Sequence, residues 1–422
     1  MLFFVALLAC RPDATEPSTT PEVAPLDPAI IARFDPHRIQ AHTEVLTGDE
    51  MGGRVPGSFG SEDARNYIEG VMLEIGLEPL GQDGGYVFSY PNTPYPDRYQ
   101  ALRDGTITEM ATDTGYDLVG VLPGSDPALS DEYMVVMAHY DHLGVTPDGE
   151  VYNGAFDNAA AVAMNLEIAR VLMEENAAPG RSTLFLFTDD EESGLDGAAA
   201  WINASTVPVE DIVFGISTDP LGRRMLPDFG PIALIGGERS PALQDRWMEA
   251  ARFVNAPVYF IHRDVIPIFA SDQDEFYAAD TPVPALWFTN VGFAYYHTTE
   301  DTAETIDYRM ILDNAELLAQ GLTLIGSDDQ RYSYDGPFEP AGAAAAEASR
   351  LLEDMLKSSF PSAADRELAD FYLTQLSWVI EADSQSVLDN PEVLYTATLY
   401  YILFDMSAKY PGDIPPPWPE GW

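Results

Sequence analysis

Four short apolar segments constrain the fold of this chain more than any other feature. They are residues 133–139 (YMVVMAH), 182–188 (STLFLFT), 212–218 (IVFGIST) and 284–289 (PALWFT). Continuous apolar runs of this length are typical of strands that are buried on both faces of a parallel sheet. An Ala-rich helix is predicted over residues 157–174, with Asp157 or Asn158 as its cap. The alternation predicts an α/β fold with a mostly parallel sheet flanked by helices.

The remaining segments predict further parts. Residues 1–9 resemble a signal peptide, and residues 10–28, rich in Pro, Thr and acidic residues, predict a flexible tether. The folded domain is expected over 29–328, with an early helix from Ser61 to Gly76. An all-α extension is expected over 329–422, with helices at 341–356, 363–381 and 392–408. On the second of these, one face carries Leu368, Phe371, Tyr372, Leu376, Val379 and Ile380.

The charge balance excludes one class of partner. Asp and Glu number 69 against 21 Lys and Arg, which gives a net charge of −48. Nucleic acid is not expected as a partner, because binding phosphate requires concentrated positive charge. An ordinary acidic secreted protein would also fit, but lysine is nearly absent and this favours a salt-adapted surface. Either kind of surface should repel itself at low salt.

Cys10 is the single cysteine, so disulfides within the chain are excluded. It follows a short apolar run, and Leu7-Leu8-Ala9-Cys10 resembles a bacterial lipoprotein signal. That resemblance implies a lipid-anchored protein of the cell envelope or periplasm, possibly at the outer membrane, whose only membrane contact is the lipid on Cys10. The run itself is too short to span a membrane. A buried or incidental cysteine is the alternative.

Five residues at the ends of predicted elements can form one metal-binding cluster. They are His139, Asp157, Glu192, Asp219 and His297. In open α/β sheets, groups at the carboxyl ends of strands converge although they are far apart in sequence. Two divalent cations bring four positive charges and the three carboxylates remove three, which would leave one for a bridging hydroxide. Imidazole and carboxylate ligands together suit zinc. The cluster predicts a two-metal hydrolase.

Around these residues the chain resembles the M28 family of zinc peptidases. The motifs are residues 139–144 (HYDHLG), 153–158 (NGAFDN), 191–197 (EESGLDG) and 296–298 (YHT), with 53–57 (GRVPG) before them. The resemblance extends over about residues 35–315.

The resemblance implies a role for each site residue. His139 and Asp219 would hold one metal, Glu192 and His297 the other, and Asp157 would bridge the two. Glu191 would be the general base, and Asp141 would orient His139. Adjacent residues on an extended segment point in opposite directions, so Glu191 would not be a ligand as well. Three segments depart from the family pattern: Ala160-Ala161 stands where Ser-Gly is usual, Pro220-Leu221-Gly222 follows Asp219, and Gln273 stands where His is more usual.

The expected activity is that of a metal-dependent exopeptidase, in which a metal-bound hydroxide hydrolyses terminal peptide bonds of peptide substrates. An aminopeptidase is the first interpretation. A carboxypeptidase stays open because Arg223 and Arg224 follow Asp219 and could read a carboxylate. A glutaminyl-cyclase-like enzyme of the same fold and, from another class, an inactive binding module are further alternatives. His142 is interpreted as structural or substrate-facing, and the oligomeric state stays open.

Overall fold

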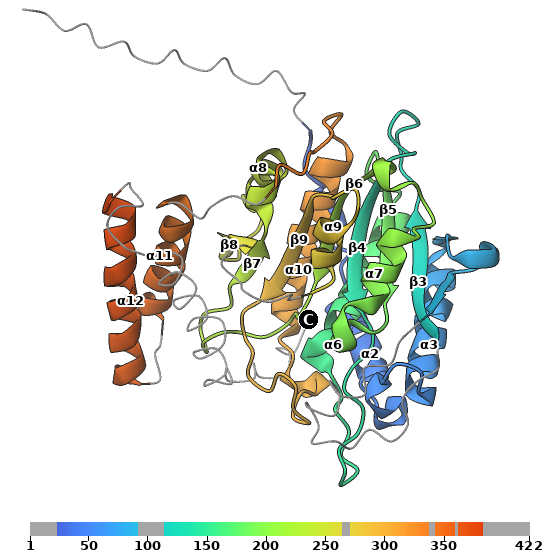
Figure 1. The fold of residues 1–422 in the computed structure, drawn as a ribbon, viewed down its shortest axis with the longest axis horizontal. Helices are drawn as coiled ribbons and strands as arrows, with labels where there is room; N and C mark the ends of the chain where they lie inside the picture. The colour runs from blue at the N-terminus through green and yellow to red at the C-terminus, as the bar shows by residue number, and fades with distance from the viewer. Residues whose placement is uncertain (1–22, 92–113, 264–270, 337–341, 359–361, 383–422) are drawn as a thin grey trace, which may run out of the picture.

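The computed structural model of the chain describes residues 23–91, 114–263, 271–336, 342–358 and 362–382. A nine-stranded sheet lies at its centre (Figure 1). The strands are β1 (Glu78–Pro79), β2 (Val87–Pro91), β3 (Thr114–Leu122), β4 (Tyr133–His139), β5 (Ser182–Thr188), β6 (Ile212–Thr218), β7 (Ile232–Ile235), β8 (Val258–Ile261) and β9 (Ala285–Asn290). Their order is β1-β3-β5-β4-β6-β9-β7-β8, and β2 also pairs with β3.

The centre of the sheet is parallel, as the apolar runs predicted. Strands β5, β4, β6 and β9 pair in parallel. The outer parts differ, because β3 joins β5 and β7 joins β9 in antiparallel fashion. The α/β fold class is confirmed, with a sheet that is mixed over its full width.

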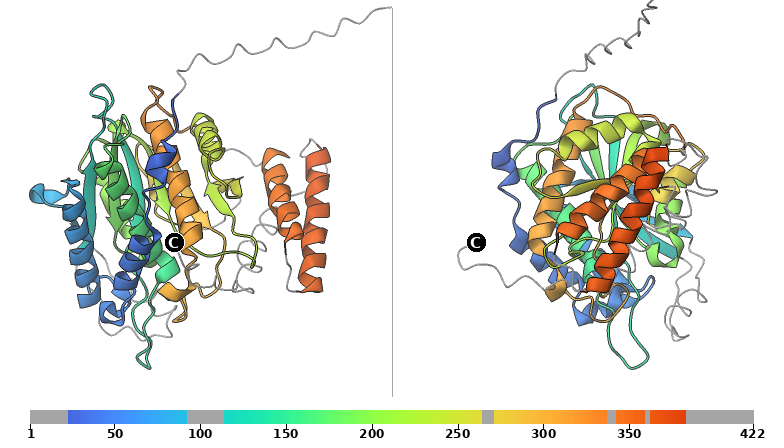
Figure 2. Two further views of the ribbon diagram at one scale, coloured as in Figure 1. Left: turned by 180° about the vertical axis from the view of Figure 1, so that it is seen from behind. Right: turned by 90° about the vertical axis from the view of Figure 1, so that its left-hand side faces the viewer.

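Helices cover both faces of this sheet. The α-helices of the described residues are α1 (Pro28–Ile31), α2 (Pro36–Leu46), α3 (Phe59–Ile75), α5 (Ala160–Glu174), α6 (Glu191–Gly194), α7 (Asp196–Asn203), α8 (Pro241–Ala250), α9 (Gln273–Ala278), α10 (Tyr308–Gly326), α11 (Gly342–Lys357) and α12 (Ala363–Ala382). Helices α2, α3 and α10 pack with α5 on one face, and α7 packs with α9 on the other. Figure 1 shows α7 in front of the sheet, and the reverse view in Figure 2 shows α10 in front.

The apolar runs form strands because both sides of each strand face a core. Met134 and Val136 of β4 belong to the core cluster that includes α5 and α10. Val135 and Met137, which alternate with them, belong to the cluster that includes Trp201 of α7. Successive side chains of a strand point to opposite faces, so a strand between two helical layers needs apolar residues at every position.

The structure corrects two predicted boundaries near the N-terminus. Helix α3 begins at Phe59 rather than Ser61, because the Ser58 side chain accepts the backbone N–H of Ser61 and caps the helix; its end at Gly76 is confirmed. The predicted tether extends too far: Leu26 is 5% exposed, and its N–H donates to the side chain of Gln320 at 2.9 Å. Leu26 therefore anchors this segment, and Val23 packs against the same core. The predicted signal peptide and Cys10 lie outside the described residues.

Helices α11 and α12 confirm two helices of the predicted extension, while the third, over 392–408, lies outside the described residues. The predicted apolar face of α12 is only partly the buried one in its described part. Tyr372 of that face packs against the core and Ala369 is buried, whereas Leu368 and Phe371 are exposed. The face turned toward α11 decides which residues are buried, and the periodicity of this helix alone did not identify that face.

Helix α11 covers the outer edge of the sheet. Strand β8 is the last strand in the order, so one side of its backbone has no strand partner among the described residues. Glu347 accepts the N–H of Phe260 at 2.9 Å, and Arg350 donates to the carbonyl of Val258 at 2.6 Å. Tyr259 donates its hydroxyl to Asp354 at 2.7 Å. Side chains of α11 thus satisfy edge groups that another strand would otherwise pair with.

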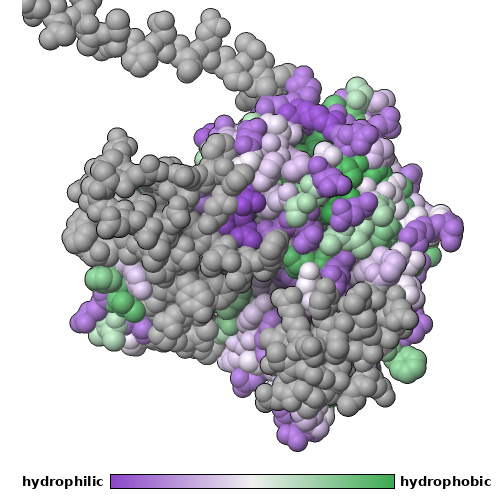
Figure 3. Space-filling view, in the orientation of Figure 1, coloured by the Kyte–Doolittle hydropathy of each residue, from purple (hydrophilic) through white to green (hydrophobic). Residues whose placement is uncertain are grey.

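The described surface has no extended apolar region on the face drawn in Figure 3, where hydrophilic residues surround smaller hydrophobic patches. Among the helices that the structure describes, none has the length and hydropathy needed to span a membrane.

Candidate metal centre

The carboxyl ends of the central strands bring the predicted site residues together. His139 ends β4, Glu191 and Glu192 follow β5, and Asp219 follows β6 directly. His297 lies in the loop after β9, in the left-handed region with φ 59°. The convergence that parallel strands predict is therefore observed for the whole set.

Asp157 lies between two histidines. Its Oδ1 is 3.1 Å from Nε2 of His139, and its Oδ2 is 3.0 Å from Nε2 of His297. The residue is buried in the turn Ala155–Ala159 that precedes α5, where its own backbone is not helical, with φ −124° and ψ 84°. The prediction that Asp157 or Asn158 caps the helix is wrong, because α5 begins at Ala160 and no side chain caps it. The carboxylate of Asp157 is instead turned toward the two imidazoles.

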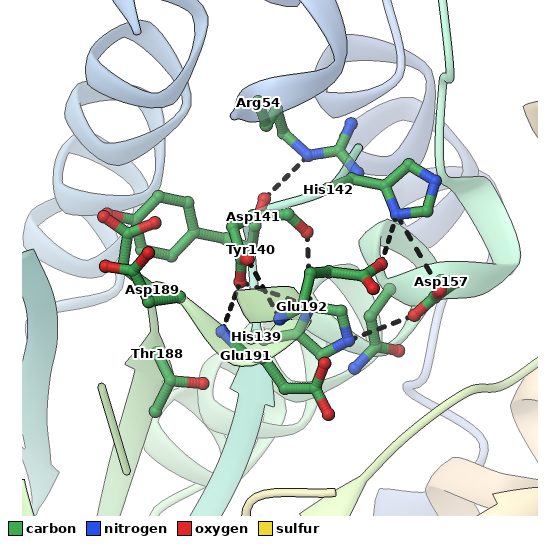
Figure 4. A network of polar contacts seen from close by, with 12 residues as sticks. Arg54, His139, Tyr140, Asp141, His142, Asp157, Thr188, Asp189, Glu191 and Glu192 are labelled. Carbon is green, nitrogen blue, oxygen red and sulfur yellow. Dashed lines mark hydrogen bonds and ion pairs between the residues drawn. The ribbon is translucent and has the colours of Figure 1, made fainter. Parts of the chain in front are cut away.

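Glu192 faces His297 with one oxygen and His142 with the other. The Oε2–Nε2 distance to His297 is 3.1 Å, and the Oε1–Nδ1 distance to His142 is 2.7 Å. His142 is fully buried, and its Nδ1 also lies 3.7 Å from Oδ2 of Asp157 (Figure 4). His142, Asp157 and Glu192 each place one potential ligand atom within 4.8 Å of the others. The structure therefore adds His142 to the cluster, where it can orient Glu192 or act as a ligand.

Packing around His142 requires a glycine in the turn before Asp157. Gly154 has φ 59°, and a Cβ built there would lie 2.5 Å from atoms of the His142 ring. Only glycine adopts this conformation without strain or collision.

Glu191 lies near His139 and Asp219, whereas Glu192 lies near His142 and Asp157. One of its carboxylate oxygens falls within 4.8 Å of ligand atoms of His139 and Asp219. Burial raises the pKa of the Glu191 carboxyl well above its ordinary value, and the carboxylates of Asp219 and Glu192 act in the same direction. Glu191 and Glu192 stand on the short helix α6, not on an extended segment as predicted. The two side chains therefore point in different directions because they are successive residues of a helical turn, not because they alternate along a strand.

Asp141 contacts His139, which it was predicted to orient, and also the segment that begins at Glu191. The Nδ1 of His139 lies 3.2 Å from the backbone carbonyl of Asp141 and 3.5 Å from its carboxylate. The same carboxylate accepts the backbone N–H groups of Glu191 at 3.1 Å and Glu192 at 3.2 Å. Asp141 therefore joins the end of β4 to the start of α6.

Asp219 completes the arrangement around His139. Its Oδ1 lies 3.2 Å from Nε2 of His139, and its Oδ2 accepts the hydroxyl of Ser271 at 2.6 Å. Trp287 donates its indole N–H to the Asp219 carbonyl. The Pro220 that departs from the family pattern leaves the carboxylate directed at His139.

Arg54 joins the segment after His139 to the turn before Asp157 through hydrogen bonds to their backbone carbonyls. It is 1% exposed, and its guanidinium donates to the carbonyls of Tyr140 at 2.7 Å, Asn153 at 2.7 Å and Gly154 at 3.0 Å. Burial lowers its pKa to about 10. Since Tyr140 follows His139 and Gly154 precedes Asp157, this one cation links the two ligand-bearing segments.

The residues present fit a pair of divalent cations. Oδ2 of Asp157 and Nε2 of His297 are buried and close, yet neither makes a hydrogen bond of acceptable geometry. Burying such polar atoms without partners is costly. Two cations, one on each side of Asp157, would give these two atoms partners. They would also balance the negative charges of Glu192 and Asp219. The mixed imidazole and carboxylate donor set is one that zinc accepts.

Several residues that shape the centre were not identified from the sequence. Arg54 was noted only within a motif, and Asp301, which contacts the Asp157 turn, was not noticed. In a chain with 69 acidic residues, one more aspartate carries no signal by itself. The one feature of the sequence that could have pointed to Asp301 is its position, four residues after His297 in the same loop.

Part of the chain is similar in sequence to known peptidases. Residues 117–322 match the sequence model of peptidase family M28. The putative endoplasmic reticulum metallopeptidase 1 of Schizosaccharomyces pombe is 28% identical over 210 residues, which cover 46% of this chain and 23% of that protein. This chain thus matches about a quarter of that relative's length.

Solved structures share the fold. A leucine aminopeptidase precursor from Bacteroides thetaiotaomicron superposes with a TM-score of 0.51 at 17% identity, covering 69% of this chain and 97% of the other. A glutaminyl cyclase from the same organism, bound to N-acetylhistamine, gives 0.51 at 16% identity and covers 69% and 98%. Residues 117–322 are therefore similar in sequence to peptidase family M28, and the chain shares the fold of these solved structures.

Proposed function

We propose that this protein is a zinc-dependent aminopeptidase with two metal ions per chain. One observation carries the proposal: Asp157 places one carboxylate oxygen at His139 and the other at His297, at 3.1 and 3.0 Å. In this proposal His139 and Asp219 complete one metal site, and Glu192 and His297 complete the other. When bound, such a pair of cations activates water and polarises a carbonyl group.

Glu191 is proposed as the proton carrier. It has a carboxylate oxygen within 4.8 Å of ligand atoms of His139 and Asp219, and it is the carboxylate of that group without a proposed ligand role. In the reaction, the water oxygen bonds to the peptide carbon and the carbon–nitrogen bond breaks. Glu191 accepts the proton of the attacking water and delivers it to the departing amine nitrogen.

The arginines after Asp219 support recognition of an amine rather than a carboxylate. Arg223 is buried and lies 2.7 Å from Asp301, and Arg224 lies 2.6 Å from Asp307. Both guanidiniums are thus engaged by carboxylates of the protein itself. A carboxypeptidase that used them would rely on guanidiniums whose charge is already paired within the protein.

A substrate panel tests the activity. Aminoacyl chromogenic amides, N-blocked peptides with a free carboxyl end and peptides with N-terminal glutamine would be incubated with and without a chelator. We expect chelator-sensitive release of the first residue from free amino ends. Cleavage only at carboxyl ends, or cyclisation of glutamine without hydrolysis, would contradict the aminopeptidase assignment.

Glu191→Gln separates binding from chemistry. We expect this variant to retain about two metal ions per chain by elemental analysis, while turnover falls by roughly 10²–10⁴-fold, as for loss of a general base. Glu304→Gln, an exposed change of the same type, is the control. Unchanged turnover in Glu191→Gln would remove Glu191 from its role.

A further inference from the structure

Asp301 holds the turn that carries Asp157. Its carboxylate accepts the backbone N–H of Phe156 at 2.8 Å and the backbone N–H of Asp157 itself at 3.2 Å. Its backbone carbonyl accepts the N–H of Ala155 at 3.2 Å. Three successive amides of this turn therefore depend on one residue, whose side chain is fully buried.

Arg223 in turn holds Asp301. Its guanidinium lies 2.7 Å from Oδ1 of Asp301 and donates as well to the hydroxyl of Thr305 and the carbonyl of Ala294. The same guanidinium stands 5.1 Å from the centre of the Phe156 ring. Arg223 is 5% exposed, so its geometry is set by protein contacts rather than by solvent.

These contacts join three segments that each bear a proposed ligand. Arg223 comes from the loop that begins at Asp219, and Asp301 lies four residues after His297. Both act on the turn of Asp157. A shift of any of the three segments would alter the hydrogen bonds of the other two.

We propose that Asp301 and Arg223 are positioning residues that set the spacing of the two metal sites by fixing the Asp157 carboxylate between them. Partners behind metal ligands commonly change metal affinity by roughly 10–100-fold when they are removed. Here the partner acts on the backbone of the ligand, so its loss would leave Asp157 present but misplaced. This inference rests on the proposed role of Asp157 as the bridging ligand.

The chain offers a matched control next to Arg223. Arg224 forms the same kind of pair with Asp307, at 2.6 Å, and Asp307 caps α10 rather than a ligand segment. Arg223→Gln and Arg224→Gln therefore each remove one arginine–aspartate pair from neighbouring positions. Only the first pair touches the Asp157 turn.

The experiment measures Zn²⁺ affinity by competition with a chromophoric chelator, together with the unfolding free energy of the metal-free protein. We expect Arg223→Gln and Asp301→Asn to weaken at least one of the two zinc sites by roughly 10–100-fold, with Arg223→Lys restoring part of the loss. Arg224→Gln should lower stability yet leave both affinities within about 3-fold, which is below that range.

Two results would overturn the proposal. One is native zinc affinity in folded Arg223→Gln and Asp301→Asn, and the other is an equal loss of affinity in Arg224→Gln. If Asp301→Asn does not fold, the two Arg223 variants decide the matter. Because zinc affinity is measured without substrate, absence of peptidase activity in the native protein would contradict the proposed function and leave this inference standing.

Discussion

At the scale of single residues, the site is crowded with buried carboxyl groups that the metals would not touch. Asp117 of β3 is fully buried; its Oδ1 accepts the N–H of Asp189 at 2.9 Å, and its Oδ2 has no hydrogen-bond partner. Burial raises the pKa of Asp117 well above its ordinary value, and the charges of Asp272 and Asp190 act in the same direction. Burial likewise raises the pKa of Asp272 to about 7.

The raised pKa of Asp117 predicts a pH-dependent cost in stability. The folded state binds this proton more tightly than the unfolded state, whose aspartate pKa is about 3.9. The contribution of protonated Asp117 to the unfolding free energy is thus complete below about pH 3.9 and is lost as the pH rises toward the pKa of the folded state. Asparagine stays neutral at every pH. Asp117→Asn should therefore raise the unfolding free energy at pH 7, by about 1.4 kcal/mol for every pH unit by which the folded pKa of Asp117 exceeds the unfolded one.

Urea unfolding of the metal-free protein at several pH values measures this effect. Near pH 4 the native protein and Asp117→Asn should agree closely, and the gap should open as the pH rises. Asp148→Asn, in an exposed loop, is the control and should show no such gap. A gap between the two proteins that does not widen as the pH rises would contradict this prediction.

At the scale of elements, the contacts of α11 assign a role to the helical extension. Its Glu347 and Arg350 occupy backbone groups of β8 that face away from β7. Uncovered edges of this kind pair with edges of other molecules. The first of the two described helices therefore protects the sheet, while α12 packs against α11 and exposes Phe371.

Removing both side chains should promote self-association. We expect Glu347→Ala/Arg350→Ala to form dimers or larger species through β8, because the N–H of Phe260 and the carbonyl of Val258 lose their partners. Sedimentation velocity over a concentration series would detect this. Glu353→Ala/Lys357→Ala removes the same charges from exposed positions of the same helix, and equal association in both variants would contradict an edge-specific effect.

At the scale of the whole molecule, a net charge of −48 acts against compaction. The repulsion among exposed carboxylates is screened over about 10 Å at 0.1 M salt and over shorter distances at higher salt. Few arginines and two lysines are present to offset it, and several of the arginines are engaged in buried pairs, such as Arg223 with Asp301.

The thermal unfolding midpoint should therefore rise with sodium chloride from low to molar concentrations. Sucrose at matched osmolality stabilises through exclusion from the surface, not through screening, and serves as the control. A midpoint that responds equally to sucrose and to salt would argue against charge repulsion as the cause.

The sequence by itself determined the central strands and the types of residue at the site. Strands β4, β5 and β6 have the predicted bounds, because a strand buried on both faces needs an unbroken apolar run that is visible locally. The convergence of His139, Glu192 and Asp219 follows from that, since parallel strands end at the same edge.

Only the tertiary structure decided which groups support the proposed ligands. The turn of Asp157, the contact of His142 with Glu192, the pair of Asp301 and Arg223, and the cover of β8 by α11 all join segments far apart in the chain. Such contacts leave no periodic or local trace, because the partner of a buried polar group is set by folding distant segments together. In a chain this acidic, the aspartate that holds a ligand in place could be distinguished from the others only by its neighbours in space.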